Sequence, residues 1–381
     1  MMKIREIRVV RVNAPPFEGP RTQPRRSGWA EDAEVANPMS RYPKVKRHRR
    51  MWLPAWERAW CQVTAEDGTW GLGTLSFAPM LAPVVGHLAS QLVGEDCLAT
   101  DRLADMMLRM TKPYGSTGLA SYAVSAVDLA LWDLKGKLLT QPVYSLLGGP
   151  QKDRIFCYAT GNDVDWYKEL GFRAFKLACP YGPADGLEGM KRNEAFVARV
   201  RETIGEESEL MLDCWMAFDV EYAVRLAEML RPYRIRWMEE CLVPEDRDGH
   251  EALRRRLPWQ TLATGEHWYT PMPFQWALRH DVVDILQPDI NWCGGVTTCR
   301  KIADAAEAAG KSVILHGGGV KLLRPRLHVG LDFGGLPAGG ILHEIFGAHG
   351  HVLAQVIESE LVVRSVGDVT GVGGAAVGGL H

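Results

Sequence analysis

The stretch Leu210-Met211-Leu212-Asp213 shows the pattern that decides the fold, a short apolar run that ends in an acidic residue or a histidine. The residues that end five such runs are Asp213, Glu239, Glu266, Asp289 and His316. They are separated by 26, 27, 23 and 27 residues, about the length of a strand, a crossover helix and two loops in a parallel α/β unit. Each polar residue therefore falls at the C-terminal end of a strand, where a (β/α) barrel keeps its chemistry.

The same alternation of strands and helices extends on both sides of this series. Residues 155–158 and 174–177 are predicted to be the first two strands, with Lys176 near the end of the second. Apolar periodicity predicts helices at residues 189–204, 220–230, 249–256, 273–279 and 297–309. An eighth strand is expected at residues 340–343 and ends at Glu344. Eight units of this kind predict a parallel sheet that closes into a barrel over residues 121–344.

The preceding 120 residues predict an α+β domain. Residues 4–12 alternate between apolar and charged side chains, as a half-exposed strand does. Two further strand-like runs, 60–63 and 70–75, flank Asp67-Gly68, which is a strong hairpin signal. Residues 82–110 show helical periodicity in two segments.

Two segments complete the predicted division of the chain. A helix is expected at residues 121–139, where Asp133 and Lys137 support it at i,i+4. Residues 345–381 are expected to pack back on the first domain, with a glycine-rich coil at 367–380.

Residues 14–50 are rich in proline and basic residues and predict a long loop, and such loops are often lids. Six Lys or Arg residues lie between positions 41 and 50. They can form a solvated basic surface or a subunit contact. Alternatively, the loop is a lid that attracts an anionic substrate and places Arg49 on its carboxylate. Nucleic-acid binding is the weakest alternative, since the rest of the chain offers no matching basic face.

Composition excludes several classes of protein. The chain has 381 residues and a formal net charge of −2, so it has no general attraction to nucleic acid or membranes. It lacks an apolar run of about 18 residues and a signal-peptide apolar region near its start. The eight cysteines are scattered without paired spacing and are expected to be buried reduced thiols. We expect a cytoplasmic homo-oligomer.

Asp213, Glu239 and Glu266 end three consecutive strands and are therefore expected to point into one mouth. Without a cation, these carboxylates would repel one another and raise each other's pKa. All-oxygen ligation with room for water suits Mg²⁺. The alternative is that each acid caps a helix or pairs with a lysine.

Asp289 and His316 end the next two strands, so their side chains can meet. A carboxylate on one ring nitrogen fixes the tautomer and makes the other nitrogen a better base. The alternative is a structural histidine bonded to a backbone group. A metal beside such a base suggests abstraction of a proton α to a carboxylate, because the resulting enediolate needs strong electrostatic stabilisation.

With these residues in view, the chain resembles the enolase superfamily, mandelate racemase subgroup, and is similar to the L-rhamnonate dehydratase group of acid-sugar dehydratases. The resemblance covers residues 37–319 and rests on the motifs Asn37-Pro38-Met39-Ser40, Val127-Asp128-Leu129-Ala130-Leu131-Trp132-Asp133-Leu134, Leu212-Asp213-Cys214-Trp215-Met216, Trp237-Met238-Glu239-Glu240-Cys241-Leu242, Gly265-Glu266-His267, Gln287-Pro288-Asp289, Trp292-Cys293-Gly294-Gly295 and His316-Gly317.

This resemblance implies a modified (β/α)7β TIM-like barrel beneath an α+β capping domain. It also implies Mg²⁺ on Asp213, Glu239 and Glu266, and a base dyad of His316 and Asp289. The lid within the capping domain would then set the choice of substrate.

The other candidate site residues carry less defined roles. Lys176 is expected either to hold the substrate carboxylate or to pair with Asp213. His267 is expected to contact substrate or to support a metal ligand. Glu344 is expected to contact the enediolate or the substrate hydroxyls.

Departures from the subgroup narrow the expected reaction. Racemases of the subgroup carry a second lysine where this chain has Ala178, so one-base elimination is favoured over racemisation. No histidine precedes His48 in the lid, and His316 is followed by three glycines. We therefore expect dehydration of a sugar acid, L-rhamnonate or a related aldonate, to a 2-keto-3-deoxy acid. The alternatives are dehydration of L-lyxonate, L-mannonate or a diacid sugar, an epimerase or cycloisomerase, and a non-catalytic ligand-binding barrel.

Overall fold

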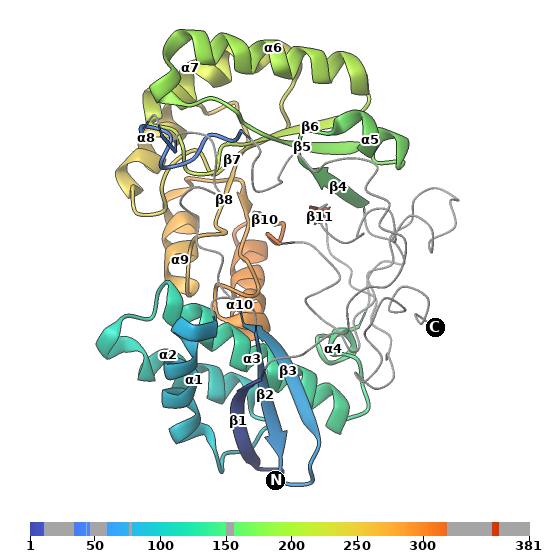
Figure 1. Ribbon diagram of the computed structural model, residues 1–381, viewed down its shortest axis with the longest axis vertical. Coiled ribbons are helices and arrows are strands. Elements are labelled where there is room, and N and C mark those ends of the chain that lie inside the picture. The colour runs from blue at the N-terminus through green and yellow to red at the C-terminus, as the bar shows by residue number, and fades with distance from the viewer. Residues whose placement is uncertain are drawn as a thin grey trace.

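The computed structural model describes residues 1–10, 34–42, 44–45, 59–75, 78–149, 156–317 and 353–357. Figure 1 shows a small sheet with several helices at one end of the molecule and the strands of a larger sheet, with their helices, at the other. Helix α10 (Gly295–Ala308) of the larger part extends down to α3 (Leu119–Leu138) of the smaller part. The arrangement agrees with the predicted α/β barrel and α+β domain.

The small sheet is antiparallel and has the strand order β1-β2-β3. Its strands are β1 (Ile4–Val10), β2 (Ala59–Ala65) and β3 (Trp70–Leu75), and the hairpin falls at the predicted Asp67-Gly68 turn. The predicted helical region of residues 82–110 forms α1 (Ala78–Leu92) and α2 (Thr100–Met110). A short α4 (Val143–Leu146) and a 3-10 turn (Lys112–Tyr114) complete this part of the chain.

Helix α3 packs directly on β3, because the strand offers it two glycines. A Cβ atom at Gly71 or Gly73 would overlap the backbone of α3 at Ala130 or Ala126. The predicted Asp133–Lys137 ion pair is present at 2.8 Å, and Asp133 Oδ2 also accepts the backbone N–H of Leu72 at 2.8 Å. Helix α3, which the predicted domain division assigns to the barrel, therefore packs on the N-terminal sheet. The domain boundary at residue 120 stays a prediction.

The larger sheet contains seven parallel strands in the order of the chain, followed at the β4 edge by the antiparallel β11 (Leu353–Ile357). The parallel strands are β4 (Phe156–Thr160), β5 (Ala174–Ala178), β6 (Glu209–Asp213), β7 (Met238–Glu239), β8 (Leu262–Thr264), β9 (Ile285–Leu286) and β10 (Ser312–Val313). The helices between them are α5 (Val164–Glu169), α6 (Gly186–Ile204), α7 (Val220–Leu230), α8 (Arg247–Arg256), α9 (Pro271–His280) and α10, with 3-10 turns at Pro183–Asp185 and Arg231–Tyr233.

One layer of side chains fills the inside of this curved sheet. Successive strands or strand ends supply one residue each, namely Tyr158, Ala174, Met211, Trp237, Ala263, Ile285 and Ile314. All of them are buried, and large and small residues alternate along part of the layer. Because side chains alternate along a strand, the inward position of Met211 also turns Asp213 inward, above this layer. The layer is the floor of the site.

The sequence did not predict helices α4 and α5, the 3-10 turns or strand β11. Helix α5 is only six residues long, which is too short for a clear periodic pattern. Strand β11 pairs antiparallel with β4, and its residues were assigned only to a C-terminal segment. The predicted eighth strand at 340–343, Glu344, Arg49 and most of the predicted lid lie outside the described residues.

Candidate active site

The strands bring the five predicted residues to one rim of the sheet. Asp213 and Glu239 are the last residues of β6 and β7, and Glu266 follows β8. Asp289 and His316 follow β9 and β10 and form a parallel bridge with each other. The regular spacing in the sequence thus corresponds to one shared edge.

Lys176 of β5 binds two of the predicted metal ligands. Its Nζ lies 2.9 Å from Asp213 Oδ2 and also contacts Glu239 Oε1. The lysine is 1% exposed, and although burial opposes its charge, Asp213 and Glu239 hold its pKa well above the ordinary value. The predicted pairing of Lys176 with Asp213 is therefore present, and the same ammonium serves Glu239.

The carboxylate of Glu239 is held on both sides. Its Oε2 accepts hydrogen bonds from Trp237 Nε1 at 2.9 Å and from Gln287 Nε2 at 2.7 Å. Burial acts to raise the pKa of Glu239, but Lys176 and these hydrogen bonds outweigh it and the pKa is lowered. Burial prevails at Asp213, where Lys176 opposes it only in part and the pKa is raised.

A second group of side chains surrounds Glu266. His267 Nδ1 lies 2.6 Å from Glu240 Oε1 and 3.6 Å from Glu266 Oε1. Burial and the nearby Glu240 raise the pKa of Glu266 to about 8, against the opposing effect of His316 and His267. Glu240 Oε2 is buried and has no hydrogen-bond partner among the described residues. Glu240 was not among the predicted site residues, although the Glu239-Glu240 doublet offered a signal.

Both groups offer donors for a hard divalent cation. Ligand atoms of Glu240, Glu266 and His267 lie within 4.8 Å of one another, whereas Asp213 and Glu239 are joined through Lys176. Lys176 contacts only Asp213 and Glu239, and burial raises the pKa of both Glu240 and Glu266. A cation with oxygen ligands would favour the ionised forms of these glutamates, and the unpartnered oxygen of Glu240 is an available donor.

The predicted dyad is formed by Asp289 and His316. The carboxylate oxygen Oδ2 accepts from His316 Nδ1 at 2.7 Å, and the other ring nitrogen, Nε2, lies 3.4 Å from Glu266 Oε2. Burial acts to lower the pKa of His316, but Glu266 and Asp289 outweigh it and the pKa is raised. The dyad therefore aims its second nitrogen at the carboxylate cluster, as a base acting on a substrate there requires.

The loop after Asp289 adds two residues that the sequence reasoning missed. Asn291 donates to Asp289 Oδ1 from its backbone N at 2.7 Å and from Nδ2 at 3.0 Å. The ring of Trp292 packs between both histidines, with centroids 4.9 Å from His316 and 5.4 Å from His267. Neither residue type is a common acid or base, so neither was singled out.

The position expected for a second base holds no titratable group. Ala178, the last residue of β5, is fully buried against Val35 and Trp215. Asn162 bonds to its backbone, with Oδ1 accepting from Ala178 N at 2.9 Å. A two-base enzyme would need an amine at the end of β5, and Ala178 places an apolar methyl group there.

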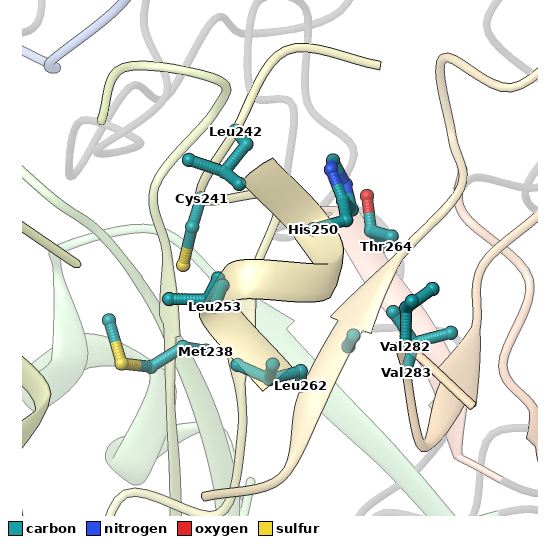
Figure 2. Close-up of a pocket in the computed structure, with 10 residues that line it drawn as sticks. Met238, Cys241, Leu242, His250, Leu253, Leu262, Thr264, Val282 and Val283 are labelled. Carbon is teal, nitrogen blue, oxygen red and sulfur yellow. The ribbon is translucent and has the colours of Figure 1, made fainter. Parts of the chain in front are cut away.

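Figure 2 shows a cavity that lies apart from this rim, between α8 and the strands β7 and β8. Its walls are mainly apolar and include Leu253, Leu262 and Val282, with His250 at one side. The space of about 10 Å³ is at most enough for a single water molecule. A sugar acid has no room there, and none of the five strand-end residues lines this cavity.

Comparison with known proteins gives the same assignment. Residues 57–148 match the family model of the mandelate racemase / muconate lactonizing enzyme N-terminal domain, and residues 162–369 match the enolase C-terminal domain-like model. The chain belongs to the enolase superfamily. The predicted relationship and the predicted superfamily fold, a modified barrel with a capping domain, are both confirmed.

Several members of the enolase superfamily are similar to this chain. An L-rhamnonate dehydratase of Saccharopolyspora erythraea is 44% identical over 295 residues, which is 77% of this chain and 75% of the relative. The solved rhamnonate dehydratase of Gibberella zeae complexed with Mg has a TM-score of 0.77 at 33% identity, covering 85% of this chain and 82% of that one. The 3,6-anhydro-D-galactonate cycloisomerase of Zobellia galactanivorans has a TM-score of 0.63 at 32% identity, covering 68% and 75%.

Two further observations concern predictions from composition. The eight cysteines are reduced thiols, and all are buried except the half-buried Cys157. Among the described residues, no helix is long and apolar enough to cross a membrane.

Proposed function

We propose that this enolase-superfamily member is a Mg²⁺-dependent hydro-lyase that dehydrates L-rhamnonate, or a closely related aldonate, to the 2-keto-3-deoxy acid. The 44% identical relative is an L-rhamnonate dehydratase, and a similar solved rhamnonate dehydratase was complexed with Mg. The cluster of buried carboxylates supports a cation site, and the His316–Asp289 pair supports a base beside it.

Asp213, Glu239 and Glu266 are the proposed metal ligands. When bound, Mg²⁺ supplies a positive charge that holds the substrate carboxylate and stabilises the charge that develops on it. Lys176 approaches Asp213 and Glu239 from β5, so it limits their mutual repulsion and fixes their orientation. Its proposed role is to keep two ligands ionised and in place.

His316 is the proposed base. Asp289 holds its Nδ1, which directs Nε2 towards the cluster at which the substrate carboxylate binds. His316 Nε2 removes the proton from C2, and the imidazolium then returns a proton to the C3 hydroxyl, which leaves as water. The resulting C2–C3 enol is a tautomer of the 2-keto-3-deoxy acid and rearranges to it, so the net change is the loss of one water molecule.

One observation carries this assignment: in the described part of the rim, Asp289 holds Nδ1 of His316 and leaves Nε2 directed at Glu266, while Ala178 offers no titratable group. An epimerase that works with two bases needs a second proton donor on the other face of the substrate. Elimination of a β-hydroxyl can be completed by the base that started it.

Two measurements test the proposal. A panel of acid sugars incubated with the Mg²⁺-loaded enzyme and assayed with semicarbazide should give a 2-keto product from L-rhamnonate. His316→Asn should lower kcat by about 10³-fold and abolish exchange of the substrate α-proton with solvent deuterium. His280→Asn, at an exposed site on α9, is the matched control. Exchange at the wild-type rate in His316→Asn would show that His316 is not the base.

A cycloisomerase is the second candidate, since one similar solved structure is a 3,6-anhydro-D-galactonate cycloisomerase at 32% identity. Such an enzyme also begins with a metal and a base, so the same rim would serve it. The product separates the two, because an isomer of the substrate retains its mass whereas a dehydration product is lighter by one water.

Some predicted features extend this proposal. We propose that His267, held by Glu240, contacts a substrate hydroxyl. The roles of Arg49 and Glu344, the homo-oligomer and the cytoplasmic location stay predictions.

A further inference from the structure

We propose that Asn291 is a positioning residue that holds the base dyad in place and ties it to the N-terminal sheet through Thr74. The proposal rests on the proposed function in one respect, the role of His316 as the base. It names neither a new acid nor a new base.

Asp289 is bonded through both of its oxygens. Oδ2 faces His316 Nδ1 at 2.7 Å, while Oδ1 accepts two hydrogen bonds from Asn291, from its backbone N at 2.7 Å and from Nδ2 at 3.0 Å. The two hydrogen bonds from Asn291 to Oδ1 fix the rotation of the Asp289 carboxylate about its Cβ–Cγ bond. The direction in which the carboxylate presents Oδ2 to His316 therefore depends on Asn291.

The orientation of the Asn291 amide follows from the same contacts. A carboxylate only accepts hydrogen bonds, so the NH2 group must face Asp289 and the carbonyl oxygen must face away. That oxygen accepts from Thr74 Oγ1 at 2.7 Å. The contact joins residues 217 positions apart, because Thr74 belongs to β3 of the small sheet.

Few other side chains could replace Asn291. The position needs a donor towards a carboxylate and an acceptor towards a hydroxyl within one short planar group, which an amide supplies. An aspartate would place a second negative charge against Asp289, and an apolar residue would leave both partners without their bonds.

The next residue makes a parallel contact. The ring of Trp292 packs on His316 at 4.9 Å and on Tyr122 of α3 at 5.6 Å. Two successive residues of one loop therefore touch the dyad on one side and the N-terminal part of the chain on the other. The alignment of His316 therefore depends on the N-terminal part of the chain packing against the barrel rim.

Removal of the amide or the hydroxyl tests the proposal. Asn291→Ala keeps the backbone donor and should lower kcat about tenfold with KM changed less than about threefold, since losses of this size follow when a supporting hydrogen bond is removed. Thr74→Val should lower kcat by about threefold, and Thr74→Ser, which restores the hydroxyl, should recover most of that loss. Thr203→Val, which removes an exposed hydroxyl on α6, controls for the substitution itself.

The double variant separates positioning from general stability. If Thr74 acts through Asn291, the double variant with Asn291→Ala and Thr74→Val should be no slower than Asn291→Ala alone. Independent additive losses would overturn the proposal. So would a lower melting temperature with an unchanged kcat, or a Thr74→Ser variant as slow as Thr74→Val.

A measurement that needs no substrate keeps this inference distinct from the proposed function. In ¹⁵N-histidine NMR spectra of the resting protein, Asn291→Ala should shift the His316 Nδ1 proton and speed its exchange with solvent, while Thr203→Val should not. An unchanged signal would overturn the positioning role. If no acid sugar is turned over by the wild type while this shift is seen, the proposed function fails and the positioning role stands.

Discussion

The two sides of the barrel rim neutralise their buried carboxylates in different ways. On the lysine side, which consists of Lys176, Asp213 and Glu239, one permanent ammonium contacts both acids. On the histidine side, which consists of Glu266, His267, Asp289 and His316, positive charge is present only when a ring is protonated.

The consequence is visible in two glutamates at successive strand ends. The pKa of Glu239 is lowered, chiefly because Lys176 outweighs burial, whereas burial and Glu240 raise the pKa of Glu266 to about 8. A fixed cation is suited to hold two of the three proposed metal ligands in place, while the third, Glu266, lies on the histidine side. A side whose charge is conditional is suited to move a proton.

The largest effect is expected on the histidine side. Asp289→Asn removes the charge that orients His316 and stabilises its protonated form, so kcat should fall by about 10³-fold or more. The measurement is steady-state kinetics on L-rhamnonate. Asp281→Asn, at an exposed position whose left-handed backbone asparagine tolerates, is the control. A loss of less than tenfold would mean that the dyad is structural.

The lysine side should respond in stability. Lys176→Met leaves Asp213 and Glu239 buried without their cation and should lower the free energy of unfolding by about 3 kcal/mol. Urea unfolding in the presence of EDTA measures it. Arg192→Met, which breaks an exposed ion pair with Glu188, should change it far less, because solvent screens exposed pairs. Equal losses in the two variants would contradict the distinction between the two sides.

Metal addition should connect the two sides. Mg²⁺ at about 100 times its Kd should stabilise the protein by about 2.7 kcal/mol, because it binds only the folded chain. Asp213→Asn should remove most of this gain, while sodium chloride of equal ionic strength should not reproduce it in the wild type. Thermal unfolding with and without Mg²⁺ is the measurement, and a gain that survives Asp213→Asn would argue against Asp213 as a ligand.

The smallest effect concerns the docking of α10, the helix that follows the Asp289 loop. Its Thr297 donates to Asp128 of α3 from Oγ1 at 2.6 Å and from N at 3.1 Å, and burial nevertheless raises the pKa of Asp128 to about 7. Between about pH 4 and 7 the folded protein keeps a proton that the unfolded chain has released. Stability from this group is therefore present at low pH and lost as the pH rises through 7.

We expect the free energy of unfolding to fall between pH 5 and pH 7.5, and Asp128→Asn should remove that fall. Denaturant unfolding at pH 5 and pH 7.5 in both proteins measures the difference. A pH dependence that is the same in wild type and Asp128→Asn would exclude Asp128 as its source.

The sequence predicted most of the elements because their signals are local. Helix α7 begins and ends at the predicted residues, and the hairpin forms at Asp67-Gly68. Helix α5 and strand β11 were missed because one is a six-residue helix and the other pairs with a distant strand. Local patterns carry little information about either case.

The sequence predicted the residues of the candidate site less completely than it predicted the helices and strands. Spacing and strand ends predicted four acids and His316, since acids and histidines stand out by their chemistry. Glu240, Asn291 and Trp292 were missed because their roles depend on a neighbour's atoms. Glu240 is defined by His267, and Asn291 by a carboxylate on one side and a hydroxyl on the other.

The local pattern of the chain was enough to predict that Asp213, Glu239, Glu266, Asp289 and His316 share one rim, because similar spacing between parallel strands places their ends at one edge. Which partner each of them meets depends on the packing of the whole fold. Lys176 reaches two acids through the register of β5 with β6, and Thr74 reaches Asn291 because the N-terminal sheet docks at the rim. Contacts of this kind depend on how separate elements pack, and no repeat along the chain encodes them.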